Sequence, residues 1–337
     1  MSASTAFAAQ ERVATRGTPV AWQAGMDLRH WYPICVERDE ATGQVSLCWR
    51  DMGSARFTES FFEHTLSRQP REQRRVCRTP LAALASLDDC LAPDAFIFHV
   101  SRCGSTLLTQ LLAGLPQCVV MSEPPLIDSL LRLHHDSGGA LDTVNVLRQA
   151  ILALGQRRDS AEKHFVLKLD CWHIHSLALL QQAFPGTPCL FLYREPAAVL
   201  ASHQRQRGPQ MVPGMLHPAM LPLPAYELEP GDFDGYAGQV LASLYAAGAA
   251  AAAAGKLLLI NYNQLPGIVF SELLARFGIA PSAEQLQAMH ERTGFHSKNG
   301  KHAFDGDPPG ADASRLPEIA ARLLPAYRAL EQLRLGL

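Results

Sequence analysis

The chain has 337 residues, of which 47% are hydrophobic and 18% are charged. This length and composition describe a globular protein with a sizeable core, in one large domain or two small ones. The formal net charge of −2 excludes a nucleic-acid binder that works through bulk positive charge, although it allows a local basic pocket. Only five of the 30 basic residues are lysines, at positions 163, 168, 256, 298 and 301, so each lysine is a candidate for a specific role.

Eight cysteines are spread along the chain without a CxxC pair. This spacing predicts neither a zinc site nor a disulfide framework, and it indicates buried, reduced thiols in a cytoplasmic protein. The first twenty residues lack the apolar core of a secretory signal, whereas their Arg, Ser and Ala content leaves a short organelle-targeting presequence open. The most apolar long stretch, Val240–Gly255, is dominated by alanine, so we expect a buried or half-buried helix and no membrane insertion.

The first ninety residues differ from the rest in their sequence pattern. Tyr32–Val36 and Val45–Trp49 are short β-prone runs on either side of a turn that contains Gly43, which predicts a hairpin. We therefore expect residues 1–90 to form an N-terminal accessory module. An arginine cluster follows the hairpin, and it either contacts an acidic substrate or lines a solvated helix face. Its members are Arg68, Arg71, Arg74, Arg75 and Arg78.

From residue 91 to residue 337, short apolar runs alternate with helical segments. The predicted strands are Phe96–Val100, Cys118–Met121, Phe165–Leu169, Cys189–Tyr193 and Leu257–Asn261. The predicted helices include Ser105–Leu115, Ile174–Phe184, Pro196–Arg205, Leu265–Phe277, Ala283–Arg292 and Leu316–Leu333. This alternation predicts an α/β domain with a parallel sheet and helices on both faces. Because ligands bind at the carboxyl ends of strands in such sheets, candidate functional residues are sought there.

The first candidate loop links the Phe96–Val100 strand directly to a helix. The backbone N–H groups of Cys103–Thr106 are expected to converge at the helix N-terminus as an anion cradle, with the planar donor fork of Arg102 beside them. The loop is not a Walker A motif, because Gly104 stands where that motif has its lysine and the first glycine of the motif is missing. A strand-to-helix turn without a ligand is the alternative.

The second candidate loop begins at Arg194, directly after the Cys189–Tyr193 strand. Ser202 follows eight residues later, just over two turns along the next helix. A single anion could lie between the two side chains if the loop folds back over the start of the helix. The alternative is that Arg194 caps a helix or forms an ion pair.

Together the two loops resemble those of the sulfotransferases that use 3′-phosphoadenosine 5′-phosphosulfate (PAPS). The shared pattern is a strand, (K/R)-x-G-(S/T)-T and a helix, followed later by a strand and R-x-P-x-x-x-x-x-S. The resemblance implies a P-loop α/β fold that binds PAPS as cosubstrate without a metal. It assigns Arg102, Cys103, Gly104, Ser105 and Thr106 to the 5′-phosphosulfate, and Arg194 and Ser202 to the 3′-phosphate. Cys103 stands where relatives often have serine, so one hydroxyl is absent.

Glu123 follows the next strand and matches a glutamate that the protein-tyrosine sulfotransferases and some bacterial relatives use as the base. Like charge from the two anion sites is expected to raise its pKa toward neutrality. The alternative is that Glu123 caps a helix or pairs with a loop arginine. Lys168 matches a family lysine near the transferring group. Asp170 stands where the cytosolic branch of the family has a histidine base, so it competes with Glu123 for that role.

Two histidines and two lysines are further candidates for the functional site. His173 and His175 flank Trp172 as an H-x-H pair, which is either a metal-binding pair or, by preference, two structural histidines. Lys298 and Lys301 lie in a polar loop that resembles the basic C-terminal loop of the family, which folds over the nucleotide. A basic surface loop without a ligand is the alternative.

These observations predict an enzyme that transfers a sulfuryl group from PAPS to a hydroxyl or amine of a small-molecule or peptide acceptor. Glu123, Arg102 and Lys168 are the expected catalytic residues. One alternative is an ATP-dependent P-loop phosphotransferase, which the missing Walker lysine disfavours. The other is a catalytically silent nucleotide-binding or scaffold protein. The acceptor does not follow from the fold.

Overall fold

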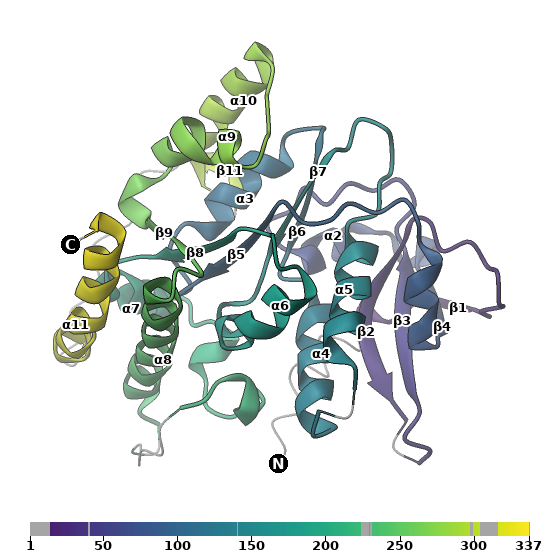
Figure 1. The fold of residues 1–337 in the computed structure, drawn as a ribbon, viewed down its shortest axis with the longest axis horizontal. Helices are drawn as coiled ribbons and strands as arrows, with labels where there is room; N and C mark the ends of the chain where they lie inside the picture. Colours follow the sequence, from purple (N-terminus) through teal and green to yellow (C-terminus); the bar gives the residue numbers. More distant parts are fainter. Residues whose placement is uncertain are drawn as a thin grey trace.

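The computed structural model describes residues 14–39, 41–139, 141–223, 229, 231–296, 299–303 and 316–336, with the backbone alone for 295–296 and 299–303. Its larger sheet has five strands in the order β6-β7-β5-β8-β9, and all of them are parallel (Figure 1). The strands are β5 (Ala95–His99), β6 (Cys118–Ser122), β7 (His164–Lys168), β8 (Cys189–Tyr193) and β9 (Leu258–Asn261). The sequence placed each of these strands to within one residue at either end.

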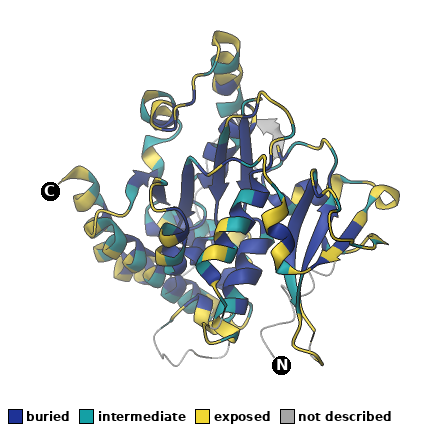
Figure 2. Cartoon of the chain, turned by 45° about the vertical axis from the view of Figure 1, so that its right-hand side comes forward, coloured by how far each residue is buried: buried dark blue, intermediate teal, exposed yellow. Residues whose placement is uncertain are grey.

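The five strands are nearly continuous runs of apolar residues, and β5, β6 and β8 are buried along their whole length. Figure 2 shows these strands at the centre of the molecule, under helices whose outer surfaces are exposed. Burial on both faces is what a parallel sheet requires, because its crossover helices cover both sides. Polar side chains are therefore concentrated where the strands end.

The helices fall into two layers. α3 (Ser105–Ala113) lies on one face of the sheet and contacts β6 and α10 (Ala283–Thr293). The other layer is made by α4 (Pro125–Asp136), α5 (Thr143–Leu154), α6 (Leu177–Ala183) and α8 (Phe233–Ala253), with α7 (Pro196–Arg205) and α11 (Leu316–Leu335) packed beside α8 (Figure 1). The chain crosses the sheet in one direction from β5 to β6 and in the other direction from β6 to β7. Because both crossovers are right-handed, α3 lies on one face of the sheet, and α4 and α5 lie on the opposite face. The predicted α/β class is confirmed.

Short helical turns complete the second half of the chain. They are η3 (Cys171–Ser176), η4 (Pro209–Met211), η5 (Pro218–Met220), η6 (Tyr262–Gln264), the π-helical η7 (Val269–Leu273) and α9 (Leu274–Arg276). The described part of the Pro-rich stretch after α7 is irregular and holds the short turns η4 and η5. The alanine-rich run lies within α8, where its inward side chains are buried. No helix in the described ranges is long and apolar enough to cross a membrane.

The N-terminal region forms a separate four-stranded mixed sheet in the order β1-β4-β3-β2. Its strands are β1 (Thr18–Val20), β2 (Trp31–Arg38), β3 (Val45–Asp51) and β4 (Arg75–Thr79), and the helical segments α2 (Phe62–Arg68), η1 (Arg71–Gln73) and η2 (Leu81–Ser86) lie between and after them. The predicted hairpin is confirmed, because β2 and β3 pair antiparallel. β2 packs against α4, and its core residues join the same hydrophobic core as the large sheet. A domain boundary near residue 90 stays a prediction.

The arginine cluster does not form a helix face, so that expectation was wrong. α2 ends at Arg68 because Gln69 precedes Pro70 and takes an extended conformation, which the proline ring favours. Arg75 and Arg78 then lie on β4, where they pair with Asp51 at 3.0 Å and Glu37 at 2.6 Å. These are exposed ion pairs within the N-terminal sheet, and neither arginine lines the cleft described below.

The eight cysteines are free, and all except the half-buried Cys90 are buried. Burial raises the pKa of the thiols of Cys103, Cys118 and Cys189 to about 11, 12 and 11, which keeps them protonated at neutral pH. The prediction of buried, reduced thiols therefore holds for the structure.

The close packing of α8 on the sheet predicts a glycine-dependent contact. A Cβ atom at Gly248 would lie 2.3 Å from Cε1 of Phe191 on β8, and that ring is fully buried. Gly248→Ala is therefore expected to lower the free energy of unfolding by about 1–3 kcal/mol, despite the better helix propensity of alanine. Urea denaturation measures this loss. Gly186→Ala, at an exposed turn with no atom within 4 Å of the new Cβ, is the matched control; equal stability of the two variants would contradict the contact.

Candidate active site

A cleft of about 280 Å³ opens at the carboxyl ends of the parallel strands. Its walls come from the loop after β5, from Glu123 after β6, from Lys168 and Asp170 at the end of β7, and from Arg194 after β8. Segments of α7, η4 and η6 complete it. The cleft thus lies where the topology of a parallel sheet places its ligands.

The β5–α3 loop holds three residues in the left-handed region of backbone conformation. Their φ angles are +73° at Ser101, +52° at Arg102 and +83° at Gly104. Non-glycine residues in this region cost on the order of 1–3 kcal/mol each, so surrounding contacts must hold them. One such contact is the hydrogen bond that Gln210 Nε2 donates to Ser101 Oγ at 3.1 Å. Another is the 3.2 Å contact from Cys103 Sγ to the carbonyl oxygen of Leu192.

Directly after this loop, α3 begins at Ser105. The first N–H groups of a helix have no partner within it, and the helix dipole adds partial positive charge at that end. Ser105 and Thr106 both line the cleft, so this helix N-terminus opens onto it. The arrangement is a cradle that suits an anion such as a phosphate or sulfate.

Gly104 fits this cradle for a steric reason as well as a conformational one. A Cβ atom at Gly104 would lie 2.6 Å from Cδ1 of Leu265 and 3.0 Å from the ring of Tyr262. Both residues follow β9, so the end of the fifth strand closes over the loop. The lysine of a Walker A motif could not stand at this position without displacing them.

The two arginines singled out by the sequence line the same cleft. Arg102 Nη2 donates to the carbonyl oxygen of Gln206 at 2.6 Å, and Arg194 Nη1 donates to the carbonyl oxygen of Arg102 at 3.4 Å. The Arg194 guanidinium also stacks over the ring of Tyr262, 4.0 Å from its centroid. Ser202, on α7, is a further lining residue. The structure therefore brings both predicted anion-binding loops together.

Lys168 and Glu123 form a tight ion pair at the other side of the cradle. Lys168 is 1% exposed, and its Nζ lies 2.7 Å from Glu123 Oε1. Nζ also donates to Thr106 Oγ1 at 3.4 Å and lies 4.8 Å from the ring centroid of Phe61. Glu123 has a φ of +55°, so it is another strained residue that faces the cleft. The pair links the ends of β6 and β7 to the first turn of α3.

The pKa values of the two candidate bases move in opposite directions. Burial alone would raise the pKa of Glu123, but Lys168 and His99 outweigh it and lower that pKa to about 2. The expected rise was wrong, because the nearest charge to Glu123 is a cation within hydrogen-bond distance. Burial, Glu123 and Asp128 raise the pKa of Asp170 well above its ordinary value. Glu123 is thus a carboxylate near neutral pH, whereas Asp170 keeps its proton to a higher pH than an ordinary aspartate does.

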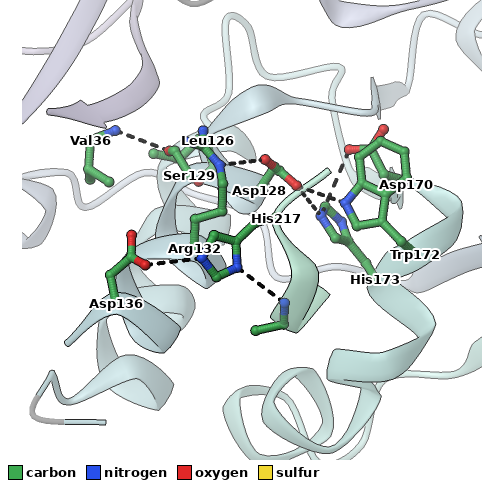
Figure 3. Close-up of polar contacts among 11 residues, drawn as sticks. Val36, Leu126, Asp128, Ser129, Arg132, Asp136, Asp170, Trp172, His173 and His217 are labelled. Atoms are coloured by element: carbon green, nitrogen blue, oxygen red, sulfur yellow. Dashed lines mark hydrogen bonds and ion pairs between the residues drawn. The ribbon is translucent and has the colours of Figure 1, made fainter. Parts of the chain in front are cut away.

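A buried carboxylate on α4 supports the wall behind Asp170 (Figure 3). Asp128 accepts hydrogen bonds from Trp172 Nε1 at 2.7 Å and from Arg132 Nε at 2.8 Å. His173 Nε2 lies 3.3 Å from Asp128 Oδ1 and 3.9 Å from Asp170 Oδ2, so one ring faces both acids. These contacts fix the turn that follows Asp170.

α4 also forms a hydrogen bond with the N-terminal sheet. The backbone N–H of Val36 on β2 donates to Ser129 Oγ at 3.1 Å, and that hydroxyl donates to the carbonyl oxygen of Leu126 at 3.0 Å (Figure 3). α4 therefore joins the N-terminal sheet to the acid-lined side of the cleft through direct hydrogen bonds. The accessory region thus contributes to the position of this wall.

The two histidines of the H-x-H pair have different partners. His173 faces Asp128, whereas His175 Nε2 lies 3.1 Å from Ser243 Oγ on α8. Within the described ranges, no group of three His, Cys, Asp or Glu side chains is arranged to hold a metal ion. Both histidines have the kind of polar partner that structural histidines have.

The predicted C-terminal basic loop is only partly described. Lys298 lies outside the described residues. Lys301 lies on β11 (Asn299–Ala303), which pairs antiparallel with β10 (Phe295–His296), and its side chain is not described. A role of these two lysines in nucleotide binding stays a prediction.

Several cleft residues were missed by the sequence argument. Tyr262 directly follows β9, so the strand-end rule that selected Arg194 would also have selected it. Gln210 lies in the Pro-rich stretch, where no periodic pattern marks it. His99 lies within the predicted Phe96–Val100 strand, and no sequence pattern singled out Phe61.

No family model and no curated protein matches this sequence. Several solved sulfotransferases are nevertheless similar in structure, as the two loops predicted. A sulfotransferase from Mycobacterium avium is 12% identical with a TM-score of 0.47, over 76% of this chain and 79% of that one. A sulfotransferase domain from the curacin biosynthetic pathway is 18% identical with a TM-score of 0.42, over 70% and 98%. A mouse sulfotransferase in complex with PAP is 12% identical with a TM-score of 0.37, over 88% and 93%. Similarity at this level assigns no role to any residue of this chain.

The raised pKa of Asp170 predicts a pH-dependent gain in stability when its charge is removed. Between its ordinary value of 3.8 and its folded value, the folded state holds more protons than the unfolded state, so stability falls as pH rises. Asp170→Asn is expected to be more stable than the wild type at pH 7, with the difference shrinking toward pH 3.8. Urea denaturation across this range measures it, with the exposed Asp88→Asn as control. A variant less stable than wild type at pH 7 would contradict the burial argument.

Proposed function

We propose that this protein is a sulfotransferase that moves a sulfuryl group from PAPS to a hydroxyl or amine of its acceptor. The observation that supports this most is the arrangement of charge in one cleft. Arg102 and the α3 N-terminus offer one site for an anion, Arg194 and Ser202 offer a second, and the Lys168–Glu123 pair lies beside the first. A donor with a phosphosulfate at one end and a separate phosphate at the other matches two anion sites and one carboxylate.

In this proposal, the donor binds through both anion sites. The N–H groups of the α3 N-terminus and Arg102 hold the 5′-phosphosulfate, and Arg194 with Ser202 holds the 3′-phosphate. Tyr262 keeps the Arg194 guanidinium in place through their stacking contact. Cys103 contributes its backbone only, because its Sγ is buried against the Leu192 carbonyl.

The transfer forms a bond between the acceptor oxygen and sulfur while the bond from sulfur to the bridging oxygen of the donor breaks. The electron pair of that bond goes to the 5′-phosphate, and Arg102, Lys168 and the helix N–H groups stabilise the negative charge that develops there. By analogy with phosphoryl transfer, most of the rate comes from positioning and charge neutralisation. The products are the sulfated acceptor and 3′-phosphoadenosine 5′-phosphate (PAP).

Glu123 accepts the acceptor proton in this proposal. It is ionised at neutral pH because of Lys168 and His99, whereas burial and the neighbouring carboxylates raise the pKa of Asp170. The negative charge of a bound donor would raise the Glu123 pKa and make it a stronger base. Asp170 then supplies a hydrogen-bond donor at the acceptor side of the cleft.

A binding screen tests the donor. PAP is expected to bind more tightly than ATP, ADP or AMP, without dependence on Mg²⁺, because only PAP occupies both anion sites. Arg194→Ala is expected to weaken PAP about 10- to 100-fold, the loss that one hydrogen bond to a charged group represents. Binding of AMP, which lacks the 3′-phosphate, should change little.

Arg78→Ala, on the N-terminal sheet, is the control and should bind PAP as the wild type does. Preference for ATP with Mg²⁺ would replace the proposal by a phosphotransferase. An undiminished preference of Arg194→Ala for the 3′-phosphate over its 2′ isomer would remove Arg194 from the site.

A pair of amide variants identifies the base. Glu123→Gln keeps the shape of the side chain but cannot accept the proton, so turnover is expected to fall by about 10²–10⁴. PAP affinity, measured by calorimetry, should not fall, because the variant removes a negative charge beside the anion site. Asp170→Asn should keep most of its turnover, since the amide preserves a hydrogen-bond donor. Full activity in Glu123→Gln together with its loss in Asp170→Asn would move the base to Asp170.

A further inference from the structure

His99 is a cleft residue whose influence on Glu123 has so far been described only through the Glu123 pKa. It is the last residue of β5, the central strand of the sheet, and is 5% exposed. Its side chain lines the cleft between the cradle loop and Glu123. A buried histidine at this point has two ring nitrogens whose partners decide what it does.

The loop fixes the protonation state of this ring. His99 Nδ1 accepts a hydrogen bond from the backbone N–H of Ser101 at 3.0 Å, so Nδ1 has no proton and Nε2 has one. Burial lowers the pKa of His99, and the nearby ammonium of Lys168 lowers it further against the opposing effect of Glu123. The ring is therefore neutral at neutral pH, with its one N–H on Nε2.

That N–H faces the proposed base. His99 Nε2 lies 3.3 Å from Glu123 Oε1, the same oxygen that receives Lys168 Nζ at 2.7 Å. The alignment of His99 Nε2 falls short of a hydrogen bond in this structure, and the backbone of Leu169 is another polar group that acts on the ring. Hydrogen bonds at active sites often tighten only when the substrate binds. Both nitrogens lie next to Oε1 of Glu123. In the proposed reaction, this leaves Oε2 to receive the proton of the acceptor substrate.

We propose that His99 is a positioning residue that holds Glu123 by one ring nitrogen and the cradle loop by the other. Nε2–H orients the carboxylate, and Nδ1 stabilises Ser101 in its left-handed conformation, with a φ of +73°. One ring thus connects the base to the anion cradle. The effect of His99 on catalysis rests on the proposed function. The contacts of its ring with Glu123 and with the Ser101 N–H do not depend on that function.

Two amide variants separate the two contacts. Asn places an acceptor near the position of Nδ1 but cannot reach Glu123, whereas Gln places a donor near the position of Nε2 but leaves the Ser101 N–H without its acceptor. His99→Asn is expected to lower kcat by roughly 10- to 100-fold, the loss of a hydrogen bond to a charged group, with PAP affinity nearly unchanged. His99→Gln is expected to recover most of kcat but to bind PAP more weakly.

A titration distinguishes this inference from the proposed function. The pKa of Glu123, followed by ¹³C NMR of the labelled carboxyl, is expected to rise in His99→Asn but not in His99→Gln, since only the former loses the donor. An unchanged pKa in His99→Asn, or equal losses in both variants, would overturn the role of His99. If the wild type transfers no sulfuryl group but the pKa still rises in His99→Asn alone, the proposed function fails and the contact stands.

The tautomer can be measured without any substitution. ¹⁵N chemical shifts of His99 in the unaltered protein are expected to show a protonated Nε2 and an unprotonated Nδ1 at pH 7. A ring protonated on Nδ1, or on both nitrogens, would overturn the proposal even if a variant failed to fold.

Discussion

The buried ion pair between Lys168 and Glu123 is the interaction on which the rest of the cleft depends. Lys168 is 1% exposed at the end of β7, and breaking a buried ion pair by removing one partner costs about 3–5 kcal/mol. The pair forms only if the ends of β6 and β7 are in register, which the pairing of Ser122 with Lys168 provides. Sheet register therefore determines where the charge of the site lies, and this charge affects the pKa values of both Glu123 and Asp170.

Backbone strain is concentrated around the same pair. Four non-glycine residues in the described part of the chain have a positive φ, and three of them line the cleft: Ser101, Arg102 and Glu123. Such conformations persist only when the surroundings hold them. Here a chain of contacts does so, from Gln210 to the Ser101 hydroxyl and from the Ser101 N–H to His99. A pre-shaped anion site needs this kind of rigidity, because the N–H groups must already point inward when the ligand arrives.

The strands of the large sheet and several residues of the cleft could be predicted from the sequence, because the sequence pattern shows where strands end. Apolar runs bounded by polar turns marked all five strands, and Arg194 and Lys168 then followed from their positions at strand ends. The three-dimensional surroundings of each residue could not be predicted from this pattern. The sign of the Glu123 pKa shift was missed because sequence gives the neighbours along the chain, whereas the 2.7 Å approach of Lys168 is a contact across strands. The arginine cluster was misread because Pro70 ends the helix before most of it, and His99 was missed because a single polar residue in an apolar strand has no periodic signal.

The opposite pKa shifts of Glu123 and Asp170 are the electrostatic result of this arrangement. Two carboxyl groups in one cleft cannot both ionise easily, so the pKa of the one nearest the cation falls while the pKa of the other rises. Lys168 and His99 both act on Glu123, and no side chain comes closer to Asp170 in an ion pair than His173 at 3.9 Å within the described residues. A site divided in this way places an ionised carboxylate and a carboxyl group of raised pKa in the same cleft. Because the charge of Glu123 depends on Lys168, which also contacts Thr106 in the anion cradle, the binding of an anion there and the basicity of Glu123 are coupled through one ammonium group.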